Sequence, residues 1–391
     1  MLTDQSAATV RATLPAVGAA IGDITPLFYK KMFAAHPDLI RNLFNRSNQA
    51  AGTQPQALAG SVAAFATYLV DHPNDRPDVM LSRIAHKHAS LGVRADQYPV
   101  VHEHLFAAIA EVLGDAITPE VAAAWDEVYW LMANALIAIE DRLYAEQGIV
   151  ASDVWREWEV VERTEMTPDV CALLLQPADD APAPSFKAGQ YVSVQVELAD
   201  GARQIRQYSL TSAPDATTRS IAVKRVHGES TPDGEVSQHL HKFVRAGDIL
   251  RVSAPYGDLV LRDTDAPLLL ASAGIGVTPM LAMLEDLVAR DHQGGVTVVH
   301  GDRSPATHAL RADHEALTAK LPSAQAHFWY EEAGHGLADL TDVPLAPGTH
   351  AYLCGPLPFM RTLREQLVAK GVASADIHYE VFGPDFWLAG L

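Results

Sequence analysis

Cysteine is nearly absent from this chain of 391 residues, which holds two, Cys171 and Cys354, far apart in the sequence. So small a number excludes a disulfide scaffold, a cysteine-based zinc finger and a four-cysteine iron–sulfur cluster. It fits a reducing compartment. A metal held by this chain would therefore need nitrogen or oxygen ligands, and the 17 histidines are the residues to examine first.

Basic residues and long apolar runs are also scarce. The 29 Lys and Arg residues stand against 48 Asp and Glu, giving a formal net charge of −19, so we expect no nucleic-acid partner, which would need a basic surface. The longest uncharged stretch, 266–284, contains two prolines and two glycines and fits a strand, a turn and a helix better than a membrane span. The first residues show no basic region before an apolar run, so we expect no signal peptide, no membrane association and a cytoplasmic protein.

The spacing of apolar residues changes twice along the chain, which predicts three domains. Residues 1–148 show helical periodicity without alternating β-branched runs, as in a helical bundle or a globin. Residues 152–263 hold closely spaced short strands, which favour a small antiparallel barrel. In residues 264–391 strands alternate with helices, which predicts a parallel sheet covered on both faces. The expected fold is therefore all-α, then antiparallel β, then α/β.

The same periodicity predicts where the elements lie. We expect helices at 26–35, 57–70, 79–91, 99–113, 119–146, 278–290, 309–321 and 357–371. We expect strands at 191–198, 204–211, 220–226, 248–254, 268–272, 296–300, 326–330, 351–354 and 377–382. Residues 177–184, rich in proline and alanine, are expected to form a loop.

One histidine of the 79–91 helix faces its apolar side. His88 continues the stripe of Met80 and Ile84 at four-residue spacing. His86 lies on the polar side, which we expect to meet solvent. A histidine on an apolar stripe is either a core residue satisfied by a neighbour or a metal ligand, since neutral imidazole is what haem iron takes from a proximal residue.

A carboxylate in the 119–146 helix raises a related question. Glu140 lies at the edge of the apolar stripe, and a carboxylate that points inward needs a partner. Two interpretations are open. Glu140 forms a rim salt bridge, for instance to Arg142 or Lys87, or it accepts a hydrogen bond from the second ring nitrogen of His88. The second arrangement would fix the tautomer and make the imidazole a more basic ligand.

Several motifs in the first half resemble the globin part of a bacterial flavohaemoglobin. They are Pro-Leu-Phe-Tyr-Lys-Lys-Met-Phe at 26–33, His-Pro at 36–37, Leu-Phe-Asn at 43–45, Ile-Ala-His-Lys-His at 84–88 and Asp-Gln-Tyr at 96–98. The similarity continues into the C-terminal half and covers nearly the whole chain. It implies a globin domain that holds haem b, followed by an FAD-binding barrel and an NAD(P)H-binding α/β domain.

The resemblance also implies roles on the proximal side of the haem. His88 matches the ligand of the iron, and Tyr98 and Glu140 match the pair that completes a hydrogen-bonded triad with it. An imidazole held in this way donates electron density to iron and helps to polarise bound O₂.

On the distal side the resemblance points to three residues. Tyr29 matches a tyrosine whose hydroxyl can hydrogen-bond iron-bound O₂, although by periodicity alone it is a core tyrosine. Leu58 matches an apolar wall residue, and Gln54 matches a distal glutamine. Pro55 follows Gln54, and a residue before proline is biased away from α geometry, so the sequence leaves the position of the Gln54 side chain open.

Motifs in the second half resemble the flavin site of ferredoxin-reductase-like enzymes. Arg-Gln-Tyr-Ser at 206–209 ends a predicted strand and offers a forked cation for a phosphate, a ring to stack on the flavin and a hydroxyl for a ring nitrogen. Ala-Gly-Gln-Tyr at 188–191, Ile-Ala-Val-Lys-Arg at 221–225 and Gly-Glu-Val-Ser at 234–237 supply the family context. Together they predict FAD. The candidate ligands are Tyr191, Arg206, Gln207, Tyr208, Ser209, Lys224 and Ser237.

A glycine turn follows the buried strand at 268–272 and opens a helix. We expect Thr278 to cap that helix and Pro279 to lie in its first turn, so that the positive helix end faces an anion. The turn is either purely structural or, as the resemblance implies, a nicotinamide-nucleotide site made by Gly274, Ile275, Gly276, Val277, Thr278 and Pro279. The resemblance adds a second nucleotide-facing loop, Cys354, Gly355 and Pro356, and a segment that covers the flavin, Val381, Phe382, Gly383 and Pro384. A lone cysteine between apolar neighbours is otherwise a core residue.

The activity implied by the resemblance is that of a nitric oxide dioxygenase. NAD(P)H gives a hydride to FAD, FAD passes single electrons to haem iron, and NO reacts with O₂ bound to ferrous haem to give nitrate. Two alternatives stay open: an O₂-binding or O₂-sensing globin with an auxiliary reductase, and a general NAD(P)H-dependent electron donor. We expect a monomer with O₂ and NO as its partners and no obligatory protein partner. The choice between NADH and NADPH stays open, because Asp302 and Arg303 argue in opposite directions.

Overall fold

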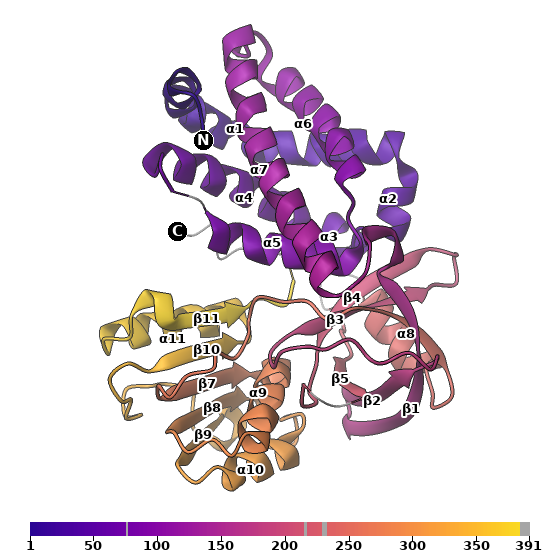
Figure 1. The fold of residues 1–391 in the computed structure, drawn as a ribbon, viewed down its shortest axis with the longest axis vertical. Helices are drawn as coiled ribbons and strands as arrows, with labels where there is room; N and C mark the ends of the chain where they lie inside the picture. The colour runs from indigo at the N-terminus through magenta and orange to yellow at the C-terminus, as the bar shows by residue number, and fades with distance from the viewer. Residues whose placement is uncertain (76, 215–216, 229–232, 384–391) are drawn as a thin grey trace.

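The N-terminal part of the computed structural model is a helical domain (Figure 1). The structure describes residues 1–75, 77–214, 217–228 and 233–383, and at Ala59 and Val79 the backbone alone. The α-helices of this part are α1 (Asp4–Ala35), α2 (Pro37–Asn42), α3 (Arg46–Ala50), α4 (Thr53–Asp71), α5 (Asp78–Leu91), α6 (Tyr98–Leu113) and α7 (Pro119–Glu146). The buried face of α1, which includes Val10, Ile24 and Phe28, packs against α4, α6 and α7.

Helix α1 is much longer than the sequence predicts. It begins at Asp4, where the Thr3 side chain accepts a hydrogen bond from the amide of Ser6, and it continues through Pro15 and Pro26. A helix start at Pro26 fits the preference of proline for first turns. Apolar residues on both sides of that proline are buried against the other helices, and this packing keeps the helix continuous at the cost of a backbone hydrogen bond.

The middle of the chain forms an antiparallel barrel. Its elements are β1 (Trp155–Thr167), β2 (Val170–Pro177), β3 (Tyr191–Glu197), β4 (Arg203–Ser209), β5 (Arg219–Lys224), α8 (Glu235–Phe243) and β6 (Ile249–Ser253). The strands pair in the order β4-β3-β6-β1-β2-β5, and a bridge between Leu210 and Ile221 joins the two edges of the sheet. The predicted barrel is confirmed. The elements β1, β2 and α8 were not predicted from the sequence. In β1, polar side chains on the exposed face interrupt the apolar pattern.

The C-terminal part is a parallel sheet with helices on both faces. Its elements are β7 (Leu268–Ala273), α9 (Val277–Ala289), β8 (Val296–Asp302), α10 (Arg311–Lys320), β9 (Ala324–Tyr330), β10 (His350–Cys354), α11 (Leu357–Ala369) and β11 (Ile377–Glu380), and the strand order is β11-β10-β7-β8-β9. Alternate residues of the central strand β7 enter different cores, Leu270 with Met280 of α9 and Leu269 with Leu363 of α11. This α/β architecture confirms the prediction. Short 3₁₀ turns lie at Ala95–Gln97, Gly114–Ala116, Ala151–Asp153, Gly274–Gly276, Glu331–Ala333 and Ser374–Asp376.

Helix α5 contacts the barrel through the polar face that we expected to meet solvent. Ser90 is fully buried, and its hydroxyl lies 2.9 Å from that of Ser193 on β3. The amide of Gly257 donates a hydrogen bond to Nδ1 of His86 at 3.0 Å. The expectation of solvent exposure was therefore wrong. Periodicity separates a polar from an apolar face, but it does not reveal which polar face another domain covers.

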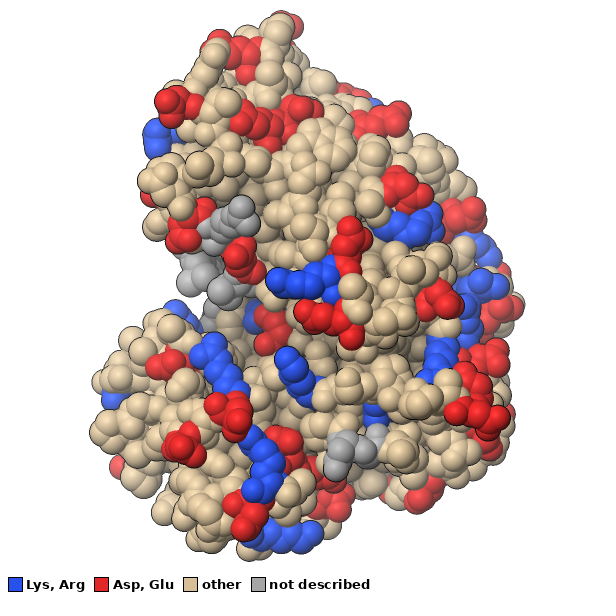
Figure 2. Space-filling model, in the orientation of Figure 1, with Lys and Arg blue, Asp and Glu red and all other residues tan. Residues whose placement is uncertain are grey.

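Charge is dispersed over the surface. Figure 2 shows Asp and Glu side chains scattered among Lys and Arg over the visible face, and a notch between the helical domain and the α/β part. Within the described residues, no helix is both long enough and apolar enough to span a bilayer.

Candidate functional site

A hydrogen-bonded triad of side chains joins three helices of the N-terminal domain. Nδ1 of His88 on α5 lies 2.8 Å from Oε1 of Glu140 on α7 and 3.1 Å from the hydroxyl of Tyr98 on α6. The same Tyr98 hydroxyl donates a 2.6 Å hydrogen bond to Oε1 of Glu140. Because both contacts use Nδ1, Nε2 of His88 is left available. The His88 side chain is 32% exposed, and the residue lines a large internal cavity.

The rim salt bridges considered for Glu140 do not form. Arg142 lies 3.7 Å from Glu146 one turn further along α7, and Nζ of Lys87 donates to the carbonyl of Gly383. Glu140 is 2% exposed and points inward instead. Burial, and then the negative charge of Glu140, raise the pKa of Tyr98, so its hydroxyl stays protonated and remains a donor.

Tyr29, on α1, lines the same cavity as His88. Burial raises the pKa of the Tyr29 hydroxyl, and the nearby side-chain amides of Gln54 and Gln49 oppose the shift. The rings of Phe33 and Phe44 pack against it at centroid distances of 5.5 and 5.8 Å. The Tyr29 hydroxyl is therefore neutral and able to form hydrogen bonds, and the tyrosine ring packs against two phenylalanine rings.

The position of Gln54, which the sequence left open, is settled by the start of α4. Gly52 precedes the helix with a φ of +71°, and Gln54 and Pro55 occupy its first turn. Proline is tolerated there because the amide it lacks would have no helical partner. Gln54 therefore reaches Tyr29 from a helical position, although the residue before a proline is biased away from one.

A cavity of about 1080 Å³ connects the helical domain with the barrel. Tyr29, Leu58 and His88 line it from the helical side, together with apolar residues of α1, α6 and α7. Its barrel side includes all the predicted flavin residues, Tyr191, Arg206, Gln207, Tyr208, Ser209, Lys224 and Ser237. The structure thus brings the two predicted groups of site residues to one continuous space.

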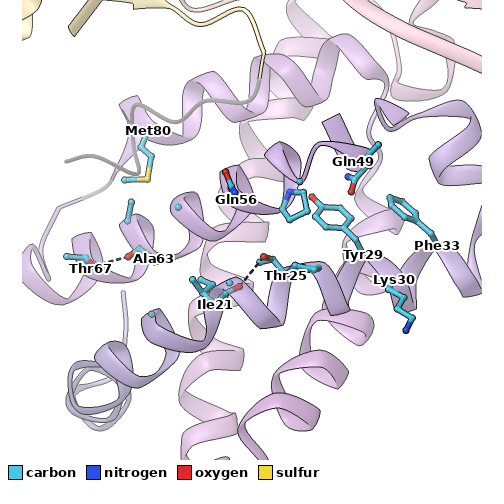
Figure 3. A pocket seen from close by; sticks show the side chains of 18 of the residues that line it. Ile21, Thr25, Tyr29, Lys30, Phe33, Gln49, Gln56, Ala63, Thr67 and Met80 are labelled. Carbon is cyan, nitrogen blue, oxygen red and sulfur yellow. Dashed lines mark hydrogen bonds between the residues drawn. The ribbon is translucent and has the colours of Figure 1, made fainter. Parts of the chain in front are cut away.

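A second cavity, of about 1360 Å³, lies beside Tyr29 and is lined mainly by α1 and α4. Figure 3 shows Tyr29 rising from α1 toward Gln49, with Thr25 and Ile21 further along the same wall and Met80 at the far side. Tyr29 borders both cavities.

The barrel end of the shared cavity carries unpaired polar groups. The hydroxyl of Ser209 is buried and has no hydrogen-bond partner within the described residues. The Arg206 guanidinium donates to Oδ1 of Asn45 at 2.9 Å and to the carbonyl of Ile205, and the described residues give it no carboxylate partner. Burial lowers its pKa. A half-buried cation that forms no ion pair with the described residues, and a buried hydroxyl without a partner, both fit a polar, anionic ligand.

Helix α8 begins beside these residues. A Cβ at Gly234 would lie 2.6 Å from Oγ of Ser237 and 2.8 Å from Cβ of Val226, so this tight turn requires glycine. The Ser237 hydroxyl accepts a hydrogen bond from the Val226 amide and donates to the Gly234 carbonyl. Gly234 and Ser237 line the same cavity, so the positive end of α8 faces it.

The glycine turn of the α/β part differs in detail from the prediction. Gly276, not Thr278, is the cap of α9, which begins at Val277, and the Thr278 hydroxyl donates to the carbonyl of Ile275 at 2.9 Å. Residues 274–276 form a 3₁₀ turn, and the helix starts at Val277, two residues earlier than the cap pattern indicated. Pro279 lies in the first turn, as expected.

This turn and the Cys354 loop approach each other closely. A Cβ at Gly276 would lie 2.2 Å from the carbonyl oxygen of Cys354, so no larger residue fits. Cys354 is fully buried, and burial raises the pKa of its thiol. Gly355 and Pro356 lead from it into α11.

The segment after β11 also borders the cavity. Val381, Phe382 and Gly383 line it, and Phe382 is 47% exposed. Pro384 lies outside the described residues.

Two contacts near the cavity have no counterpart in the sequence analysis. Asn45 caps α3, accepting from the amides of Ser47 and Asn48, and the same Oδ1 accepts from Arg206. Arg46 forms ion pairs with Asp200 and Glu235, both at 2.6 Å. An asparagine before a short polar segment is a helix-cap signal that could have located α3. The contact between Asn45 and the barrel residue Arg206 has no such signal in the sequence.

Comparisons with known proteins agree with this arrangement. A globin family model matches residues 27–136, an oxidoreductase FAD-binding domain model matches 157–261, and an oxidoreductase NAD-binding domain model matches 270–365. A flavohemoprotein of Chromobacterium violaceum is 41% identical over 404 residues, covering 98% of both chains. One from Rhizobium meliloti is 40% identical, covering 99% of this chain and all of the relative.

Solved structures give the same result. A flavohemoglobin of Malassezia yamatoensis with bound FAD and heme superposes with a TM-score of 0.91 at 40% identity, over 98% of this chain and all of that one. The FAD/NAD-binding domain of a nitric oxide dioxygenase from Vibrio cholerae has a TM-score of 0.55 at 36% identity, over 59% of this chain and 99% of its own. Identity at this level along nearly the whole length, with the matched domains in the same order, means that the chain belongs to the flavohemoprotein family.

Proposed function

We propose that this chain is a nitric oxide dioxygenase, which uses electrons from NAD(P)H to convert NO and O₂ to nitrate. The observation that carries the proposal is the shared cavity, with His88 and Tyr29 at one end and Arg206 and Ser209 at the other. A haem site and a flavin site that open into one cavity need no separate electron carrier. A similar FAD/NAD-binding domain comes from a nitric oxide dioxygenase.

The residues at the helical end fit a haem. Nε2 of His88 is available because Glu140 and Tyr98 both contact Nδ1, and the walls include Phe28, Met32 and Leu136. His88 would hold the iron. Glu140 would draw the Nδ1 proton and make the imidazole a stronger donor, and Tyr98, as a hydrogen-bond donor to Glu140, would hold that carboxylate in place.

The residues at the barrel end fit FAD. Arg206 and the start of α8 would bind its phosphates, with Lys224 and Ser237 nearby. The unpaired Ser209 hydroxyl would bond a ring nitrogen, and Tyr191 and Tyr208 offer planar surfaces for the ring. Phe382 would cover the opposite side. The turn 274–279 and the Cys354 loop would bind the nicotinamide nucleotide.

When bound, the two groups supply the redox chemistry: FAD accepts two electrons from NAD(P)H, and haem iron takes them one at a time for the reaction of O₂ with NO. The chain's own residues set the conditions for it. Tyr29, kept protonated by burial, would donate a hydrogen bond to a ligand in the distal space, beside Gln54 and Gln49. The apolar walls exclude water and favour entry of the two uncharged gases.

We further propose domains at 1–148, 152–263 and 264–391, a monomer, and action in the cytoplasm. The change from helix α7, which ends at Glu146, to the antiparallel sheet that begins at Trp155 supports the first of these boundaries.

The test is NADH-driven consumption of NO by the purified protein. We expect a Soret band with a flavin shoulder, O₂-dependent loss of NO on addition of NADH or NADPH, and nitrate as the product. His88→Ala should abolish NO consumption while leaving reduction of ferric chelates intact. NO consumption that survives this substitution would mean that the chain is a general electron donor. Very slow NO turnover with tight O₂ binding would instead identify an O₂ carrier or sensor.

A further inference from the structure

Three buried histidines gather at the carboxyl edge of the parallel sheet, away from the cavity residues described above. His300 lies near the end of β8, His308 in the loop that follows, and His314 in α10. Their exposed fractions are 0%, 3% and 0%. One ring nitrogen from each lies within 4.8 Å of one nitrogen from both others. Histidines packed this closely and removed from solvent need a reason that hydrophobic burial does not supply.

Hydrogen bonds hold two of these rings with one nitrogen turned toward the cluster. Nδ1 of His300 is 2.8 Å from the Ser272 hydroxyl, and Nδ1 of His308 is 3.0 Å from the hydroxyl of Tyr330. Nε2 of His300 has no hydrogen-bond partner among the described residues. Nε2 of His308 shares a 3.2 Å hydrogen bond with Nδ1 of His314, which a metal bound to both nitrogens would replace. Metal-binding histidines are commonly held in this manner, with the second nitrogen hydrogen-bonded to a polar group that fixes the tautomer.

A carboxylate stands beside the histidines. Oδ2 of Asp302 lies 3.6 Å from Nε2 of His300, and the Asp302 side chain is 8% exposed. Its other oxygen, Oδ1, accepts hydrogen bonds from the Thr307 hydroxyl at 2.6 Å and from the Arg303 amide at 2.7 Å. These bonds orient the carboxylate and leave Oδ2 facing His300.

We propose that His300, His308, His314 and Asp302 form a binding site for a zinc ion. Three imidazoles and one carboxylate match the tetrahedral nitrogen and oxygen set that zinc takes, whereas calcium and magnesium prefer oxygen ligands alone. The 3.2 Å between Nε2 of His308 and Nδ1 of His314 is close to the ~3.4 Å expected for two nitrogens bound to one tetrahedral zinc.

The imidazoles already have the neutral form that binds a metal, and the spacing of their rings is close to what a zinc ion requires. Burial, reinforced by the neighbouring imidazoles, lowers the pKa of His308 to about 2 and that of His314 to about 3, so both rings are neutral at pH 7. Two imidazoles on one zinc have ring centroids about 5 Å apart. The pairs 308–314 and 300–314 stand at 5.3 and 5.7 Å, but His300 and His308 stack at 3.8 Å. Binding therefore requires the His300 ring to tilt away from His308.

A zinc ion here would join the end of β8 to α10. It would also engage Asp302, which the sequence analysis considered as a determinant of NADH or NADPH preference. In the zinc-bound protein this carboxylate would be unavailable to a ribose hydroxyl. The proposal concerns a site separate from the haem and flavin, so it stands or falls independently of the dioxygenase activity.

The experiment measures zinc retained by the full-length holoprotein. Protein loaded with one equivalent of zinc sulfate and passed through a metal-free desalting column is analysed by plasma mass spectrometry, and zinc X-ray absorption reports the ligands. We expect about one zinc per chain, bound by imidazoles at the ~2.0–2.1 Å typical of zinc–nitrogen bonds. His314→Gln should reduce retention at least tenfold. His327→Gln, a histidine on β9 outside the cluster, should retain zinc like the unaltered protein.

If His314→Gln fails to fold, Asp302→Asn gives the same test without altering a buried ring, and it should weaken zinc binding at least tenfold in a competition titration against a chelator. Retention below one zinc per five chains in the unaltered protein would overturn the proposal. So would equal retention by the unaltered protein and both cluster variants, because the zinc would then be bound elsewhere.

Discussion

The hydroxyl of Ser193 on β3 donates a 2.9 Å hydrogen bond to the hydroxyl of Ser90, which lies two residues after His88 on α5. Both serines are fully buried. Gln207, from the predicted flavin motif, donates to the Ser193 hydroxyl at 3.0 Å, and the Ser90 hydroxyl donates to the carbonyl of Lys87 at 2.8 Å. A short polar network therefore fixes the helix that carries His88 against the residues that border the flavin space.

Ser90→Ala should loosen this junction. The substitution removes the acceptor of the Ser193 hydroxyl in a buried position, which costs about 1–3 kcal/mol. We expect a lower free energy of unfolding in urea, and haem reduction by NADH that slows while flavin reduction keeps its rate, both followed by stopped-flow absorbance. Ser82→Ala on the same helix, at a residue without a side-chain hydrogen bond in the described part of the chain, is the matched control. Equal haem reduction rates in the two variants would contradict a positioning role.

Glu140→Gln should weaken electron donation to the iron. A neutral amide cannot draw the Nδ1 proton of His88 as a carboxylate does, and loss of such partners typically costs ~10–100-fold in activity. We expect a lower iron–histidine stretching frequency in resonance Raman spectra and NO turnover reduced by about that factor. Tyr129→Phe, whose hydroxyl donates to the Tyr98 carbonyl and not to the triad, is the control. An unchanged stretching frequency in Glu140→Gln would refute the assignment.

How far the sequence predicts this site depends on the kind of contact involved. The inward position of His88 follows from helical periodicity. The partner of Glu140 does not, since three helices distant in sequence must first pack together. Gln49 was missed because α3 is a single short turn without an apolar stripe. The same limit explains the error at His86 and Ser90, where polar side chains that look exposed are covered by another domain.

Release of O₂ from the ferrous protein should not depend on pH across the neutral range. Burial raises the pKa of Tyr29 above the usual value near 10, so the hydroxyl remains a donor at all lower pH values. We expect a flat profile of the O₂ dissociation rate between about pH 6 and pH 9. Tyr29→Phe should release O₂ at least tenfold faster at every pH. A break in the profile of the unaltered protein below pH 9 that Tyr29→Phe abolishes would show that the hydroxyl ionises there.

Arg206→Ala should weaken FAD retention. Arg206 forms no ion pair with a carboxylate among the described residues, so its half-buried charge is available to a phosphate. A hydrogen bond to a charged group contributes about 1.5–3 kcal/mol. We expect the FAD dissociation constant to rise about ten- to a hundredfold, measured by recovery of flavin fluorescence on dilution. Arg203→Ala, on the same strand with a side chain 54% exposed, should bind FAD normally. Equal affinities would argue against a phosphate contact.

Gly276→Ala should damage the nicotinamide site without touching the haem. The added Cβ would lie 2.2 Å from the Cys354 carbonyl oxygen, so the 274–279 turn and the Cys354 loop must move apart. Such overpacking typically costs ~1–3 kcal/mol, and here it also displaces the amides expected to face the nucleotide. We expect a higher KM for NADH and slower flavin reduction, with an unaltered Soret band. Gly295→Ala, where nothing lies within 4 Å of the added Cβ, should leave both unchanged. Normal kinetics in Gly276→Ala would mean that this turn does not bind the nucleotide.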